Sequence, residues 1–386
     1  MVWIMGGVSR KKKCCRCSIT AALTVLLFAL CPLAVPAQNA PPSFDELASE
    51  ASAASTAGNL PQAIQFYQGA LQLKPEWAEG WWHLGLLQYE TNAYPSAEES
   101  LTHYIELSPN AGPAVALRGL CEFETADYAQ SLKDIETGLS LGAATDSRNE
   151  QILRYHAALL LTRAGQYQPA LQEYAWFARN GISSPELLLG LGLAGLRVPT
   201  MPKDIQPDQQ PLLAAAGEAA YQFLARHEDQ AQKAFDDLFR RFPKAVNAHY
   251  LYGYMLLQRD PDHAIDEFKQ ELQVFPTNAD ADVMLAWAYL SQNDPQAALP
   301  FAQKAFAEGP QVPTAQLVLG RSLVETGQLR AGTDRLEKAA EIDPNNVEIH
   351  IALAHAYSEE GRKEDAWRER MLSIQIQTHE ANQVAN

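Results

Sequence analysis

Proline recurs along this chain at intervals of about 34 residues, and this period restricts the fold more than any other feature of the sequence. The spaced prolines close the similar phrases LQLKP, IELSP, FRRFP, LQVFP, FAEGP and AEIDP, at Pro75, Pro109, Pro243, Pro276, Pro310 and Pro344. A repeat of this length holds one helix-turn-helix unit. Because such a unit cannot bury its apolar face alone, it must stack on its neighbours. The chain is therefore predicted to form an array of helix pairs.

Between the prolines, small and large side chains occupy fixed positions. Positions 7, 8, 20 and 32 of the unit that starts at Ala78 hold Leu84, Gly85, Ala97 and Pro109, and those of the unit that starts at Ala279 hold Leu285, Ala286, Ala298 and Pro310. Small residues let two helices approach closely, and large ones fill the space between turns. In this pattern the sequence resembles the tetratricopeptide repeat family. The resemblance implies an all-α fold without a sheet, a right-handed solenoid of about nine helix-turn-helix repeats.

The resemblance covers nearly all of residues 44–380. The predicted repeats begin at Phe44, Ala78, Gly112, Gln151, Leu212, Val246, Ala279, Pro313 and Val347. The repeats that start at Gly112 and Gln151 lack the closing proline, and the first of them has Ser131 and Gly138 where alanine is usual. The implied organisation is a leader, an N-terminal array, an interruption, a C-terminal array and a tail, over residues 1–37, 38–182, 183–211, 212–380 and 381–386.

The interruption begins like a repeat and then departs from the pattern. Ser184 and Pro185 start a helix well, as a cap followed by proline at the first helical position. Where a second helix belongs, residues 198–211 read VPTMPKDIQPDQQP, and four prolines there forbid a regular helix. We interpret 198–211 as a hinge, a partner-docking loop or a tolerated insertion. Its removal is expected to leave the flanking repeats folded, because surface loops tolerate changes in length.

The first 37 residues have the order of a secretory leader. Basic residues lie within 10–16, an apolar run covers 19–31, and small residues precede Gln38. We expect cleavage before Gln38 and a body that is periplasmic or secreted. An uncleaved membrane anchor is the alternative, although Pro32 and Pro36 would break the last turns of a spanning helix.

Charge and cysteine content exclude several classes of protein. The net charge is -16, and without the five basic leader residues 25 basic residues face 46 acidic ones, a net charge of -21. Such a surface repels phosphate backbones, so nucleic acid is not an expected partner. Four of the five cysteines lie in the leader. The fifth, Cys121, cannot form an intramolecular disulfide and is interpreted as a packed, unreactive thiol.

No motif points to catalysis, a cofactor or a metal. Residues 190–195 spell GLGLAG, the letters of a dinucleotide-binding loop, but they lie within a predicted helix, where small residues serve close packing. The nine histidines form no HExxH motif, and His249 and His350 occupy position 4 of their repeats, where packing explains them. The serines lack a GxSxG context. We therefore expect no enzyme, no cofactor and no metal site.

The family resemblance implies a concave groove lined by positions 2, 5, 9 and 12 of the first helices. Aromatic residues at those positions are the candidate partner-binding residues: Trp82, Tyr89, Phe123, Tyr155, Phe223, Tyr250, Tyr254 and Trp287. An aromatic stripe can supply binding anchors or can pack the core, and the sequence leaves both open.

We expect a protein-binding adaptor or scaffold that holds a protein or peptide partner in this groove. An accessory subunit of an envelope enzyme or assembly complex is the alternative. Self-assembly is a third possibility, because the predicted last helix, residues 364–377, carries apolar side chains that suggest an uncapped end of the array.

Overall fold

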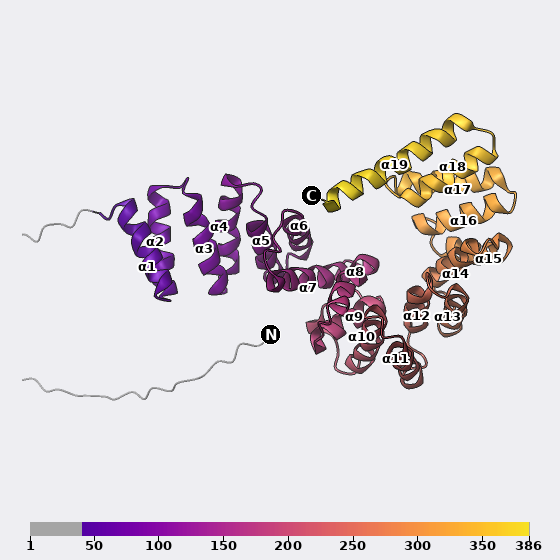
Figure 1. Cartoon of the computed structure of the whole chain (residues 1–386), viewed down its shortest axis with the longest axis horizontal. Helices are drawn as coiled ribbons and strands as arrows, with labels where there is room; N and C mark the ends of the chain where they lie inside the picture. Colours follow the sequence, from indigo (N-terminus) through magenta and orange to yellow (C-terminus); the bar gives the residue numbers. More distant parts are fainter. Residues whose placement is uncertain (1–40, 386) are drawn as a thin grey trace, which may run out of the picture. The chain divides into compact units, whose positions relative to one another are not determined.

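The computed structural model describes residues 41–385, with side chains described as far as Thr378. Over that range it contains 19 α-helices, one short 3-10 helix and no strand. Helices that follow one another in the chain lie side by side as pairs (Figure 1), which confirms the predicted all-α helical-repeat solenoid. The leader lies outside the described residues, so its cleavage and the export of the body stay predictions.

The first array has four helix pairs: α1 (Phe44–Thr56) with α2 (Leu60–Leu73), α3 (Ala78–Glu90) with α4 (Tyr94–Leu107), α5 (Gly112–Glu124) with α6 (Tyr128–Ser140), and α7 (Ser147–Arg163) with α8 (Tyr167–Arg179). The middle of the chain holds α9 (Pro185–Gly195), the 3-10 helix η1 (Pro202–Asp204), and the pair α10 (Gln210–Leu224) and α11 (Glu228–Arg241).

The remaining helices form four pairs: α12 (Ala248–Leu256) with α13 (Pro261–Val274), α14 (Ala279–Ser291) with α15 (Pro295–Glu308), α16 (Pro313–Glu325) with α17 (Leu329–Ile342), and α18 (Val347–Glu359) with α19 (Lys363–Ala385). In six of the nine predicted repeats, the first helix begins at the predicted residue. The exceptions are α7, α10 and α12, which start two to four residues away. The last helix, α19, continues to Ala385, beyond the predicted end of the array at residue 380.

The second helices end in one of two ways, and both are readable in the sequence. Where the spaced proline is present, the helix stops two residues before it, as α2 does at Leu73 ahead of Pro75. Proline disfavours helical geometry in the residue that precedes it. Where the proline is missing, after α6 and α8, the chain turns through Gly142 and Gly181, whose φ angles are 79° and 68°. Glycine adopts this left-handed conformation without a steric penalty.

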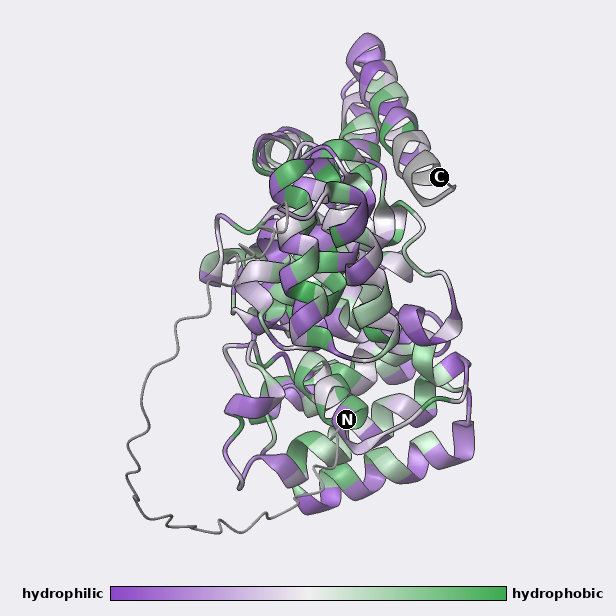
Figure 2. Cartoon of the chain, turned by 90° about the vertical axis from the view of Figure 1, so that its left-hand side faces the viewer, coloured by the Kyte–Doolittle hydropathy of each residue, from purple (hydrophilic) through white to green (hydrophobic). Residues whose placement is uncertain are grey.

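Packing between the helices follows the small-and-large pattern. Gly85 on α3 lies so close to Leu101 on α4 that an added Cβ would approach the Leu101 Cδ2 to 2.9 Å. The weakly matching repeat compensates for its unusual residues, because the Ser131 hydroxyl donates to the Gly119 carbonyl and Gly138 lies against Ala116. Figure 2 shows apolar residues on the sides of the helices that meet other helices and polar residues on the outward sides.

The interruption is more tightly built than its sequence predicts. Helix α9 has no second helix of its own, but it packs directly against α10. An added Cβ on Gly192 would collide with the Leu213 carbonyl, and one on Gly217 would collide with the Leu188 carbonyl. The run GLGLAG at 190–195 therefore serves close helix packing, as predicted from its place inside a helix.

The segment between α9 and α10 also contributes side chains to the core, which argues against the expectation that its removal leaves the flanking repeats folded. Met201 is 2% exposed and packs with the apolar cluster of α5, α6 and α7. Ile205 is 8% exposed and packs with the cluster built around α8 to α13. The prolines do prevent a regular α-helix here, and only the short η1 forms. The segment nonetheless inserts two apolar side chains, because its backbone passes close to both clusters.

No helix in the described range 41–385 is both long enough and apolar enough to cross a membrane.

Candidate functional site

The eight candidate aromatic residues do not form one continuous stripe. Seven of them are half-buried, and Tyr250 is 5% exposed. Two pairs line separate hollows, and the other four pack against neighbouring side chains. The candidate surface is thus divided into two hollows, one lined by uncharged side chains and one that includes three arginines.

Trp82 and Tyr89 lie together in the first of these places, which we call the apolar hollow. It has a volume of about 470 Å³ and is lined from α3, α5, α7 and the turn before α7 by Trp82, Leu86, Tyr89, Pro113, Ala116, Leu117, Leu120, Ala143, Thr145, Asn149, Ile152 and Leu153. None of these side chains is charged. The Trp82 ring leans on Tyr104 with centroids 5.5 Å apart, and burial raises the pKa of Tyr89 to about 12. This hollow can accept apolar side chains of another molecule, since burying apolar surface is favourable.

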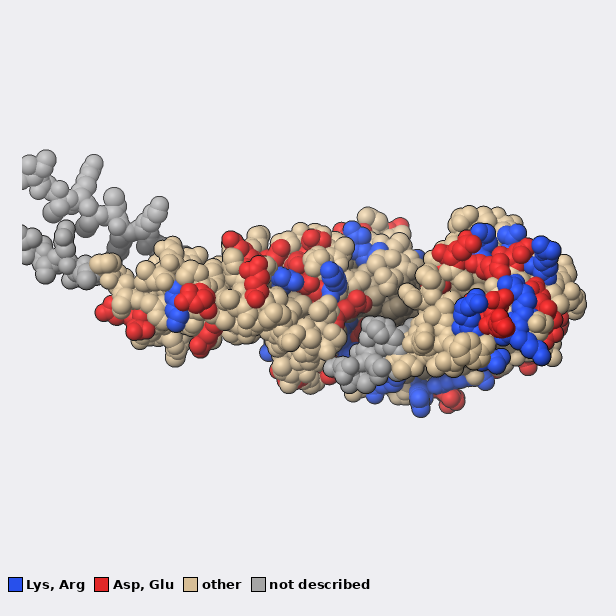
Figure 3. Space-filling view, turned by 90° about the horizontal axis from the view of Figure 1, so that it is seen from above, with Lys and Arg blue, Asp and Glu red and all other residues tan. Residues whose placement is uncertain are grey.

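The first two repeats, which contribute α3 to the apolar hollow, are acidic. Lys74 is the sole basic residue between positions 41 and 117, whereas nine acidic residues lie there, at Asp45, Glu46, Glu50, Glu76, Glu79, Glu90, Glu98, Glu99 and Glu106. In Figure 3 the repeats nearest the N-terminus carry mainly acidic side chains, while basic and acidic groups interleave toward the C-terminal repeats. An apolar segment flanked by basic residues would suit this surface.

Phe123 and Tyr155 meet around His156 and line neither hollow. The His156 ring lies edge-on to Phe123, with centroids 4.6 Å apart, and stands 5.8 Å from Tyr155. Burial lowers the pKa of His156 and raises that of Tyr155 to about 12. Both aromatic residues also border the apolar clusters of α5 to α8, so packing accounts for their positions.

Phe223 and Tyr254 line the second place, which we call the cationic hollow. It has a volume of about 420 Å³ and lies between α8, the end of α10 and the end of α12, lined by Gln168, Leu171, Gln172, Ala175, Arg179, Phe223, Leu224, Arg226, Tyr254, Met255, Leu257, Gln258 and Arg259. Three of these residues are arginines and none is acidic. The Arg259 guanidinium lies over the Phe223 ring, 4.9 Å from its centroid.

Tyr250 is a packing residue rather than an accessible anchor, which corrects the expectation that it faces an open groove. Its ring stacks on Tyr254 with centroids 6.3 Å apart and packs against Phe268. The Arg197 side chain donates to the Tyr250 hydroxyl at 3.3 Å and forms an ion pair with Asp280 at 2.8 Å. Burial raises the pKa of Tyr250. Tyr250 therefore helps hold α12 against the turn after α9.

Trp287 is half-buried on α14 and lines neither hollow. The Arg321 guanidinium lies 5.2 Å from its ring centroid, and the side chain borders the apolar clusters on both sides of it. The prediction that Tyr250, Tyr254 and Trp287 share one binding groove is thus not met, because only Tyr254 of the three lines an open hollow of useful volume.

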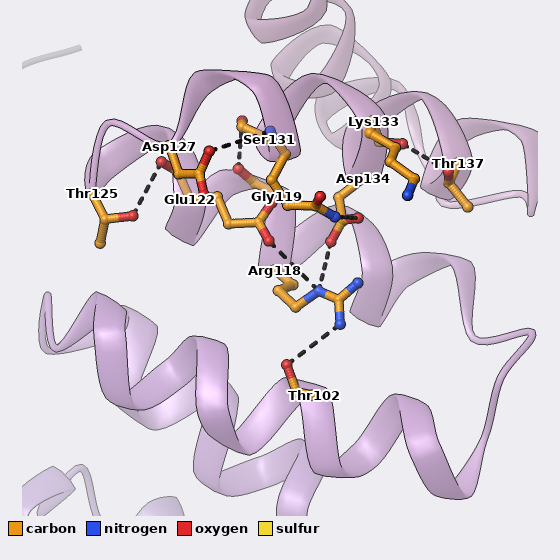
Figure 4. Close-up of polar contacts among 11 residues, drawn as sticks. Thr102, Arg118, Gly119, Glu122, Thr125, Asp127, Ser131, Lys133, Asp134 and Thr137 are labelled. Carbon is orange, nitrogen blue, oxygen red and sulfur yellow. Dashed lines mark hydrogen bonds and ion pairs between the residues drawn. The ribbon is translucent and has the colours of Figure 1, made fainter.

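One cluster of titratable groups is enclosed between α5 and α6 (Figure 4). The Arg118 Nε donates to Asp134 at 2.6 Å and lies 3.8 Å from Glu122, while its terminal nitrogen donates to the Thr102 hydroxyl. One cation thus faces two buried carboxylates. Burial, and then the charge of Asp134, raise the pKa of Glu122 to about 8. None of these residues lines either hollow, so the cluster offers no reacting centre to a substrate there.

This cluster predicts a pH-dependent stability. The folded-state pKa of Glu122 lies above the unfolded value of about 4.3, so folding favours the protonated acid. Its stabilising contribution is complete below that unfolded value and is lost as the pH rises through about 8. Glu122→Gln keeps the group neutral. We expect this variant to exceed the wild type in free energy of unfolding by about 5 kcal/mol at pH 9, at about 1.4 kcal/mol for each pKa unit, and to match it near pH 4.

Urea denaturation at the two pH values measures this difference. Glu124→Gln is the matched control, because Glu124 lies two residues away on α5 and is exposed. Equal effects of the two substitutions at pH 9 would show that Glu122 is ionised in the folded protein without cost.

The residues predicted to be structural behave as such. Cys121 is 0% exposed, and burial raises its pKa to about 12, so the thiol is packed and unreactive. His249 stacks on Phe239 with centroids 4.0 Å apart and contacts Glu267 at 2.7 Å. His350 contacts Glu369 and the Pro344 carbonyl. Among residues 41–385, no three His, Cys, Asp or Glu side chains gather where one metal ion could contact them all.

Sequence reasoning missed the arginines of the cationic hollow. Arg179 is the last residue of α8, and Arg226 and Arg259 follow the ends of α10 and α12. Cations at helix C-termini are common because they complement the helix dipole, so each looks ordinary by itself. Only their convergence on one hollow distinguishes them. No pattern of neighbouring residues in the sequence predicts that convergence.

Comparison with known proteins agrees with this architecture. The tetratricopeptide repeat family matches residues 49–112, 225–260 and 258–313 with one of its profiles and residues 336–368 with another. No curated protein matches the chain.

Several solved structures are similar over part of the chain. YrrB, described as a TPR protein with an unusual peptide-binding site, is 20% identical and covers 45% of this chain and 89% of its own, with a TM-score of 0.37. MamA is 21% identical over 42% of this chain and 96% of its own, with a TM-score of 0.38. MamA from Desulfovibrio magneticus RS-1 is 18% identical over 44% and 96%, with a TM-score of 0.39.

Proposed function

The chain is a tetratricopeptide repeat protein, and from that premise we propose that it is an adaptor or scaffold that holds a protein partner in its apolar hollow. One observation carries this proposal. A hollow of about 470 Å³, lined by Trp82 and Tyr89 and by no charged side chain, lies open on the first array. Aromatic side chains around a concavity are typical of the anchors that dominate protein interfaces.

The chemistry of the partner follows from the hollow and its surroundings. Apolar side chains of the partner would fill the space between Trp82, Leu117 and Ile152. Basic residues that flank those side chains would face the acidic surface of α1 to α4 and speed the encounter. We therefore propose a partner segment that is apolar at its centre and basic at its ends.

Blocking the hollow tests the proposal without removing core side chains. Thr145 is exposed and lines the hollow from the turn before α7. A partner is first recovered with the purified chain as bait, and its Kd is then measured for each variant. Thr145→Trp should weaken binding about 30-fold, the effect of losing one interface anchor, and should leave the Tm near that of the wild type.

Thr137→Trp is the matched control, because Thr137 is also exposed, lies on α6 and does not line the hollow. Trp82→Ala supplies a second variant that enlarges the hollow instead of filling it. If the partner binds the Thr145 and Thr137 variants with the same Kd, the apolar hollow is not the binding site.

Three further parts of the proposal concern place and assembly. We propose that the body is exported, on the strength of the leader sequence. An accessory subunit of an envelope enzyme or assembly complex is the alternative role, in which the same hollow would hold the enzyme. Self-association through α19 is a further candidate, because Trp367 is 64% exposed there and Ile374 is also exposed. Recovery of the chain's own copies by the bait would favour it.

A further inference from the structure

We infer that the cationic hollow is a second binding site, which takes an acidic, extended segment of a protein. An apolar side chain of that segment lies against Phe223 and Tyr254, and its carboxylates bind the arginines at the rim. The inference rests on the proposed function only in treating the ligand as a protein. The two hollows are built from different helices, α3, α5 and α7 in one case and α8, α10 and α12 in the other.

The charges of the hollow carry the argument. Arg179 and Arg226 form no ion pair within 4 Å in the described part of the chain, and the Arg179 Nε donates only to the Ala175 carbonyl of its own helix. Arg259 has a carboxylate of Glu228 at 3.8 Å, beyond hydrogen-bonding distance. Some other arginines of this chain are closely paired, as Arg154 is with Glu150 and Glu173 at 2.9 Å.

These three arginines are distinguished by lining one hollow that no acidic residue lines, in a chain with 46 acidic and 30 basic residues. The planar guanidinium fits a carboxylate with two parallel hydrogen bonds, which makes arginine the side chain suited to recognising such groups. The rim therefore lacks the anion that its chemistry favours, and an acidic ligand would supply it.

The floor of the hollow selects a ligand that also has apolar groups. Leu171 is buried there, and Phe223, Leu224, Tyr254 and Met255 are half-buried and present carbon atoms. A volume of about 420 Å³ accommodates side chains of an extended peptide. A long polyanion such as nucleic acid would gain little from the floor and would be repelled by the chain as a whole, whose net charge is -16.

The hollow lies between helices on either side of the interruption of the repeats. Helix α9 lacks a second helix, so α8 contacts both α9 and the first helix of the following repeat, α10. Side chains of α8 and of the ends of α10 and α12 line this open space, among them Arg179, Arg226 and Arg259. The arginines that lack a close carboxylate therefore lie next to the interruption of the repeats at α9.

Peptide binding to the purified chain tests the inference. The probe is a fluorescein-labelled peptide with a Leu-Phe pair flanked on both sides by glutamates, and its Kd is measured by fluorescence anisotropy. We expect the peptide with glutamines in place of the glutamates to bind at least about tenfold more weakly, because each hydrogen-bonded charge contributes that much or more. Raising the salt concentration should weaken the glutamate peptide and not the glutamine one.

Charge reversal at the rim locates the site. Arg179→Glu combined with Arg226→Glu should weaken the glutamate peptide by about 100-fold, about tenfold for each arginine. Both side chains are exposed, so folding should be retained. Lys244→Glu combined with Arg330→Glu changes the net charge equally at exposed positions outside both hollows and is the matched control.

Three outcomes would overturn the inference. The control pair could weaken binding as much as the rim pair, which would indicate a general charge effect. A glutamate peptide with serines in place of Leu-Phe could bind equally well, which would indicate an unspecific anion site. The glutamine peptide could bind as tightly as the glutamate peptide. None of these results bears on the apolar hollow, whose own test uses Thr145→Trp and a different ligand.

Discussion

Replacing residues 199–209 with a Gly-Ser linker of equal length should lower the stability of the middle repeats by about 4 kcal/mol or more, because two buried side chains are lost together. Met201 packs with the cluster of α5 to α7, and Ile205 packs with the cluster around α10. Truncating one such buried side chain costs about 2–5 kcal/mol. The segment fastens the first array to the helices that follow it.

The matched control is the same linker with Met201 and Ile205 kept at their positions. It should recover most of the lost stability, since the other residues between them, Pro202, Lys203 and Asp204, are exposed or half-buried. Thermal unfolding followed by circular dichroism measures both variants. A linker variant whose Tm equals that of the wild type would show that the segment is a dispensable insertion after all.

Gly217→Ala should destabilise the protein by about 3 kcal/mol, the upper range for overpacking a close contact. A Cβ at this position would collide with the Leu188 carbonyl of α9, and the neighbouring Gly192 faces the Leu213 carbonyl in the same way. Backbone atoms cannot rotate away as a side chain can, so α9 and α10 would have to separate. This cost exceeds the gain of about 1 kcal/mol that alanine normally brings to a helix.

Gly69→Ala is the control for the change in helix propensity. Gly69 lies within α2, and its added Cβ would meet only the flexible Leu47 side chain, 3.3 Å away. This variant should be neutral or more stable by up to about 1 kcal/mol in urea denaturation. The close packing of α9 on α10 would be refuted by effects of the same sign at Gly69 and Gly217.

The repeat architecture was predictable because its signals are local. A proline stops the helix that precedes it, as at Pro75, and glycine at a fixed position admits a facing leucine, as Gly85 admits Leu101. These effects act between residues that are near in sequence and recur with each repeat. The helix boundaries, the pairing of helices, and the packed states of Cys121, His249 and His350 therefore followed from the sequence.

The candidate sites were only partly predictable. Position within a repeat identified Trp82, Tyr89, Phe223 and Tyr254 as groove residues, and all four line hollows. The same positions also selected Tyr250, which Arg197 and Phe268 enclose. A register position states which way a side chain leaves its helix. The register position does not predict which residues from another part of the chain will bury that side chain.

Local patterns in the sequence were enough to predict the all-helical repeat array, the ends of most of its helices and the place where the period fails. The consequences of that failure depended on contacts between helices that are distant in the chain. The tertiary structure brought Arg179, Arg226 and Arg259 to one hollow, made Met201 and Ile205 part of the core, and enclosed Glu122 beside Asp134. Helix formation depends on residues that are neighbours along the chain. The burial of a side chain and the proximity of charged groups depend instead on which distant helices meet once one helix of the array is missing.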